Sequence, residues 1–83
     1  NALRERVMAF LTARDPRLTI HDFRIVRGTG HTNVIFDLAV PFDLVPQADA
    51  IRQELEQALR ADGGKYYAVI TVDAAAFNTP HTR

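Results

Sequence analysis

Four side chains that can bind a metal ion or carry a proton lie in one apolar segment of the chain, residues 18–40. They are His21, Asp22, His31 and Asp37. The carboxylate of Asp37 is costly to bury in a sheet, so it should face outward, bind a cation or pair with an arginine such as Arg24. The chain has no cysteine and no serine, which excludes disulfides, thiolate ligands and Ser or Cys nucleophiles. Any metal ligand must be an imidazole or an oxygen, and we do not expect an enzyme.

Each candidate ligand also has a structural explanation. His21 could be a hydrogen-bonded residue at the edge of an apolar face, and His31 could be a plain hairpin side chain or a loop ligand. Asp49 falls in the first turn of a predicted helix, where a carboxylate complements the unpaired amides and the helix dipole. Asp73 ends a predicted strand, where it could shape a turn or bind a cation. The residues alone leave these alternatives open.

Two amphipathic helices are predicted from the spacing of apolar residues. The first begins near Leu3 and should end near Ala13 or Arg14, because Pro16 prevents its continuation. The second covers residues 46–61, which open with a proline and are followed by two glycines. Its apolar stripe is formed by Ala48, Ile51, Leu55, Ala58 and Leu59.

Three strands are predicted from runs of β-branched and aromatic residues, at 18–26, 31–40 and 65–72. Residues 28–30, Gly-Thr-Gly, join the first two as a hairpin. Even-numbered residues of the second strand share an apolar face, and the odd-numbered ones share a mixed face. In the third strand Val69, Thr71 and Asp73 lie opposite the apolar face.

The first strand raises a problem of side-chain direction. His21 alternates with Phe23 and Ile25, which predicts that all three share one face. Asp22 should then point away from them and pair with an arginine or cap a loop. The alternation leaves the register between the first two strands open, and a shift of one residue would move His21 relative to Asp37.

The predicted order of elements is α-β-β-α-β, an α+β two-layer sandwich of the ferredoxin-like kind, with two helices on one face of a three-stranded sheet. We expect residues 1–83 to form one domain, with residues 1–2 as a remnant of tag removal and 78–83 as a tail. The content of 47% apolar and 24% charged residues is that of a folded domain. Ten basic residues balance ten acidic ones, so no nucleic-acid partner is expected. No apolar run is long enough to cross a bilayer.

Short motifs in four places resemble the C-terminal cytoplasmic domain of cation diffusion facilitator metal transporters. They are His-Asp-Phe-Arg at 21–24, Phe-Asp-Leu at 36–38, Gln-Ala at 47–48 and Val-Ile-Thr-Val-Asp at 69–73. The resemblance implies an αββαβ, metallochaperone-like fold and a homodimer that binds divalent cations at or near its interface.

The resemblance also implies a set of metal ligands. It places a metal-binding histidine at His21 and a ligand aspartate at Asp73. Where many members carry histidine, this chain has Asp37, Asp49 and Thr71. The predicted site is therefore His21, Asp37, Asp73 and Asp49. Imidazole with carboxylates suits zinc above all, with manganese, iron(II) or cobalt as alternatives.

The function implied by the resemblance is that of a metal-sensing and dimerisation domain that regulates export by a divalent-cation efflux transporter. It would be the soluble part of an integral membrane protein, on the cytoplasmic face of the cell membrane and attached to its own transmembrane domain. The alternative is a metal-independent ferredoxin-like module that senses a small molecule or binds a protein and dimerises through its open sheet face.

Overall fold

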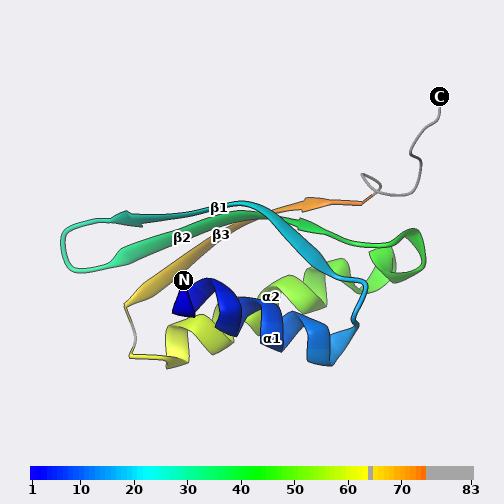
Figure 1. Cartoon of the computed structure of the whole chain (residues 1–83), viewed down its shortest axis with the longest axis horizontal. Helices are drawn as coiled ribbons and strands as arrows, with labels where there is room; N and C mark the ends of the chain where they lie inside the picture. The colour runs from blue at the N-terminus through cyan, green and yellow to red at the C-terminus, as the bar shows by residue number, and fades with distance from the viewer. Residues whose placement is uncertain (64, 75–83) are drawn as a thin grey trace.

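The fold is a two-layer α+β sandwich, in which two helices cover one face of a sheet and no described helix covers the other, here called the open face (Figure 1). The computed structural model describes residues 1–63 and 65–74. The elements are α1 (Ala2–Arg14), β1 (Thr19–Arg27), β2 (Thr32–Ala39), the 3-10 helix η1 (Phe42–Gln47), α2 (Ala48–Ala61) and β3 (Tyr66–Asp73). This order confirms the predicted αββαβ, ferredoxin-like arrangement. The predicted tail at 78–83 lies outside the described residues.

The first helix has a defined cap at each end. The side chain of Asn1 accepts hydrogen bonds from the backbone N–H groups of Leu3 and Arg4, at 2.9 and 3.1 Å. This is the usual N-cap arrangement, so Asn1 has a structural role whatever its origin. The helix ends at Arg14, as the position of Pro16 predicted. Its buried residues lie one turn apart and are Leu3, Val7 and Leu11.

The second helix begins two residues later than predicted. Pro46 lies inside η1, and α2 starts at Ala48. A tight 3-10 turn is common at the start of an α-helix, and a proline there sacrifices no hydrogen bond that the helix needs. The predicted apolar stripe is confirmed at Ala48, Ile51, Leu55 and Leu59, which are buried in the core, whereas Ala58 is exposed.

The sheet has the strand order β1-β2-β3 and is mixed. β2 lies in the middle, antiparallel to β1 and parallel to β3, and α2 belongs to the connection between β2 and β3. The covered face of β2 carries Val34, Phe36 and Leu38, which are 0–1% exposed. The predicted apolar face of the second strand is therefore confirmed.

The predicted alternation along β1 is wrong, because a β-bulge interrupts it. His21 pairs with Asp37, and Asp22 and Phe23 together face one residue of β2, Phe36, before regular pairing resumes. Phe23 stacks on Phe36 in the core, with ring centroids 5.9 Å apart. His21 is exposed on the other face. The two residues therefore face opposite ways although they are two positions apart.

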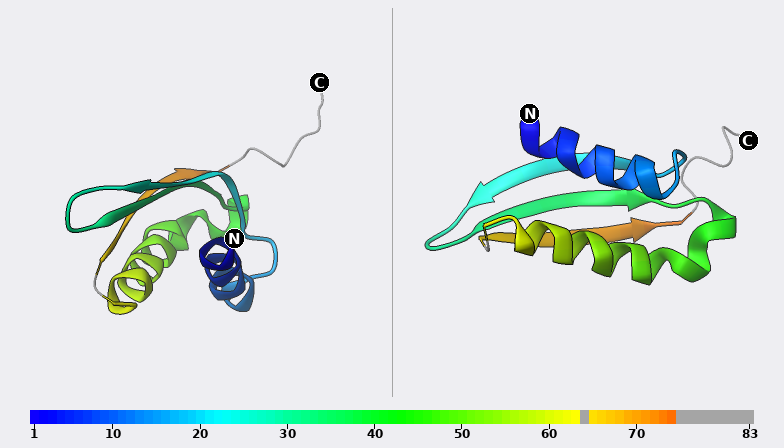
Figure 2. Two further views of the ribbon diagram at one scale, coloured as in Figure 1. Left: turned by 60° about the vertical axis from the view of Figure 1, so that its left-hand side comes forward. Right: turned by 90° about the horizontal axis from the view of Figure 1, so that it is seen from below.

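The helices lie side by side beneath the sheet, α1 along β1 and α2 along β3 (Figure 2). Ion pairs connect the two helices at both ends of their contact, Arg6 with Asp62 and Arg14 with Glu54. No helix among residues 1–63 and 65–74 is both long and apolar enough to cross a membrane.

Candidate metal centre

Three of the four predicted ligands lie on the open face at one end of the sheet. Across the strands, His21 pairs with Asp37, and Asp37 pairs with Thr71. In the neighbouring row Ala39 pairs with Asp73. Paired residues on adjacent strands project to the same face, with Cβ atoms about 4.5–5.5 Å apart in antiparallel pairs. The bulge and the register therefore bring His21, Asp37 and Asp73 to one area.

The polar groups of this area are accessible. His21 is exposed, with its Nε2 atom 3.4 Å from the hydroxyl oxygen of Thr19, and Asp37 is half-buried. Asp37 makes no ion pair with Arg24 among the described residues, although Arg24 lies on the neighbouring strand. The structural explanation of Asp37 as the partner of an arginine is therefore not realised within the described part of this chain.

Asp49 lies on the other layer, in the first turn of α2. Its carboxylate accepts hydrogen bonds from the side chains of Arg52 and Gln53, the latter at 2.9 Å. The hydrogen bond to Asp49, with a second to Glu56, raises the pKa of the Arg52 guanidinium. Asp49 thus fulfils the structural role proposed for it, and it lies on the helical layer and not on the open face of the sheet (Figure 1).

Within residues 1–63 and 65–74, no three His, Cys, Asp or Glu side chains gather into a group that could hold a metal ion. One copy of the chain places His21 and Asp37 opposite each other and Asp73 in the next row. An imidazole nitrogen and carboxylate oxygens are donors that zinc accepts. The donor types fit a divalent cation, and the coordination shell would need ligands from beyond this pair.

The other end of the open face is apolar, which the sequence analysis did not single out. Val26, Tyr67 and Val69 are 47%, 56% and 49% exposed there. His31 packs against Tyr67, with ring centroids 4.8 Å apart. The apolar residues at odd-numbered positions of the third strand, Tyr67 and Val69, are the sequence feature from which this patch could have been predicted. His31 is thus a packed hairpin side chain at the apolar end.

A charged cluster connects the loop before β1 to η1, beside the polar end of the sheet. Arg17 donates hydrogen bonds to Asp15 at 3.1 Å and to Asp43 at 2.9 Å. These hydrogen bonds lower the pKa of both carboxyl groups and raise that of the guanidinium. Arg17 therefore holds together two segments that flank the strand ends carrying the candidate ligands.

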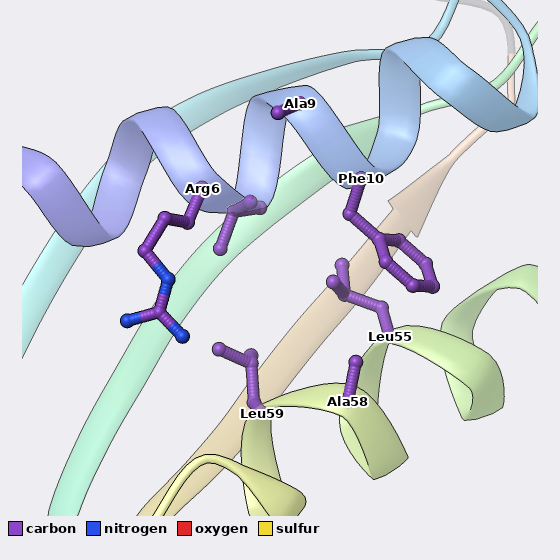
Figure 3. A pocket seen from close by; sticks show the side chains of 7 residues that line it. Arg6, Ala9, Phe10, Leu55, Ala58 and Leu59 are labelled. Carbon is purple, nitrogen blue, oxygen red and sulfur yellow. The ribbon is translucent and has the colours of Figure 1, made fainter.

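A hollow of about 310 Å³ lies between α1 and α2, on the layer away from the open face (Figure 3). Its lining is apolar except for Arg6, whose guanidinium pairs with Asp62. The lining residues are Arg6, Val7, Ala9, Phe10, Leu55, Ala58 and Leu59. Small-molecule sites usually combine an apolar lining with several convergent polar groups, and this hollow offers one.

Two solved structures of CzrB, a candidate zinc transporter, are similar to this chain. One is 33% identical in sequence, with a TM-score of 0.68 over 84% of this chain and 89% of that chain. The other, described as the zinc form, is 30% identical, with a TM-score of 0.71 over 94% of this chain and 91% of that chain. No family model and no curated protein matches.

These similarities define the class of protein. The chain belongs to the cation diffusion facilitator family and corresponds to the C-terminal domain of its members. It is therefore a domain of a cation efflux transporter, and its relatives are transporter domains and not enzymes.

Proposed function

We propose that this domain senses divalent metal ions and dimerises, and that it thereby regulates export by the transporter to which it belongs. The observation that carries the proposal is the direct pairing of His21 with Asp37 on the open face, with Asp73 in the next row. The three potential ligands come from three neighbouring strands, and α1 and α2 cover the opposite face of the sheet (Figure 1). Such a face suits a cation that is bound where two copies meet.

The proposed ligands are His21, Asp37 and Asp73 of one copy and Asp49 of a second copy. Asp49 lies on the helical layer and not on the open face, and we therefore assign it to the second copy. One imidazole with carboxylates suits zinc, and it also suits manganese, iron(II) and cobalt. The zinc form of a similar solved structure supports zinc as the first ion to test.

The proposed homodimer uses the open face. An 83-residue domain buries a modest fraction of its surface, and this one leaves Val26, Tyr67 and Val69 exposed on the face that carries the ligands. A second copy would cover these side chains and bring its own ligands to the metal. Rising metal would then favour one arrangement of the two copies. On the cytoplasmic face of the membrane, that arrangement would bias the attached transmembrane domain toward export.

Calorimetric titration of metal-stripped protein with zinc and with manganese tests the proposal. We expect saturable binding of at least one ion to the parent protein and loss of that binding in the His21→Ala variant. His31→Ala is the matched control, because it removes an imidazole from the same face but from the apolar end. Absence of binding by the parent, or equal loss in both variants, would contradict the proposed site.

The alternative function is a metal-independent module that senses a small molecule or binds a protein. The hollow between the helices is the feature that would serve it, but its lining supplies a single charged group. The same titration, combined with light scattering in the presence of a chelator, decides between the two functions. A dimer that forms fully in the presence of a chelator, together with no heat of metal binding, would favour the alternative.

A further inference from the structure

The first strand must satisfy two conflicting demands within three residues. His21 belongs on the open face opposite Asp37, and Phe23 belongs in the core against Phe36. Residues two apart on a regular strand point to the same face. A regular strand would therefore put His21 in the core or Phe23 on the surface.

The bulge at Asp22 resolves this conflict. Between the pairs His21 with Asp37 and Arg24 with Ile35, two residues of β1 face one residue of β2. Asp22 takes up the extra position with a φ of 55°, the only positive value for a non-glycine residue within the described ranges. Left-handed backbone is tolerated by aspartate and asparagine far better than by β-branched residues.

We propose that the left-handed backbone conformation at Asp22 accommodates the extra residue of β1 and so keeps His21 at the metal site, and that the carboxylate of Asp22 takes no part. It turns His21 toward Asp37 while Phe23 remains packed in the core. The value of this placement for metal binding rests on the proposed function. The placement itself can be tested without metal.

The register makes a specific prediction about residue 22. If it were removed, His21 would still pair with Asp37, and Phe23 would come directly opposite Phe36. A deletion therefore preserves the arrangement, whereas a β-branched residue at this position cannot easily adopt the bulge. The conflict returns only when the extra residue is present and cannot be left-handed.

A cysteine pair provides a readout of the placement. The chain contains no cysteine, so His21→Cys with Asp37→Cys introduces the only two thiols. Directly opposed residues on one face of an antiparallel pair are close enough to form a disulfide under an oxidant such as diamide. We expect the double-cysteine variant to form the disulfide when residue 22 is aspartate, when it is changed by Asp22→Gly, and when it is deleted.

The Asp22→Val variant should lose the disulfide, or should fail to fold while the Gly and deletion variants fold. Arg24→Val is the matched control, because Arg24 is exposed on the same strand and has no positive φ. It should keep the disulfide. Efficient cross-linking in the Asp22→Val variant, or none after the deletion, would overturn the proposal.

The same substitutions in the histidine-containing chain test the link to metal. Zinc titration should show binding that survives Asp22→Gly and the deletion and is lost with Asp22→Val. If the cross-linking pattern holds but the parent binds no metal, the positioning role stands and the metal-sensing function fails. If metal binds equally well to the Val variant, the positioning role fails and the function stands.

Discussion

The two faces of the sheet differ in how far their side chains are buried within one copy of the chain. The covered face is finished within one copy of the chain, where Phe36 and Leu38 meet the stripe of α2 and are 0–1% exposed. The open face carries the neighbouring positions of the same strand, Ile35 and Asp37, which are only half-buried. The covered face therefore supplies the core of the fold, whereas no helix of residues 1–63 and 65–74 lies over the open face (Figure 1).

The open face is itself divided along its length. At one end lie the possible ligands His21 and Asp37, and at the other lie the exposed apolar side chains of Val26, Tyr67 and Val69. An apolar patch gains by being covered, whereas a cluster of polar groups gains by binding an ion. We infer that the apolar end serves dimerisation and the polar end serves metal binding. Substitutions at one end should then remove one property and leave the other.

The largest effect is expected on the covered face. Leu55 is 1% exposed, so Leu55→Ala should lower the free energy of unfolding by about 2–5 kcal/mol, through lost burial and a cavity. Val69→Ala is the matched truncation on the open face and should cost much less in dilute, metal-free protein. Urea denaturation measures both. Equal costs would mean that the open face is as well packed as the core and would break the comparison.

The outline of the fold could be predicted from the sequence because local signals agree with it. Pro16 fixed the end of α1, and the spacing of Leu55 and its neighbours gave the stripe of α2. The start of α2 was misplaced because Pro46 is equally compatible with a 3-10 turn.

The candidate site was less predictable, because it depends on register. A bulge is a property of the pairing between strands, and nothing in the alternation of His21 and Phe23 revealed it. Asp49 was expected to join the other ligands on the strength of a resemblance, although the sequence already placed it in the first turn of a helix, where the structure has it.

The second prediction concerns the polar end. Metal that binds only the folded state should stabilise it by about 2.7 kcal/mol at a free concentration 100 times Kd, which raises Tm by on the order of 10 °C in a domain of this size. His21→Ala and Asp73→Ala should abolish the zinc-dependent rise and leave the metal-free fold intact. Asp62→Ala removes a carboxylate from the helical layer and should retain the rise. A full rise in both ligand variants would show that the metal binds elsewhere.

The third prediction concerns the apolar end. Tyr67→Asp or Val69→Asp places a charge in the patch and should shift the proposed homodimer toward monomer at micromolar concentrations, because burying an unpaired charge is costly. Light scattering with and without zinc measures the mass. Val45→Asp alters an exposed apolar residue of η1 and should leave the mass unchanged. A parent protein that stays monomeric with and without metal would contradict the proposed dimerisation through the open face.

The smallest effect is expected at the charged cluster that flanks the polar end. Hydrogen bonds from Arg17 lower the pKa of Asp15 and of Asp43, so the folded state binds protons less readily than the unfolded state. Their stabilisation is complete above the unfolded value of about 3.9 and is lost as the pH falls through the lowered values. Arg17→Ala should therefore make the urea midpoint fall less steeply on acidification below about pH 4. At pH 7 the variant should lose only a little stability, because solvent screens these exposed groups. Arg60→Ala removes an exposed arginine from α2 and should keep the slope of the parent. If Arg17→Ala also keeps it, the cluster does not connect the two segments in solution.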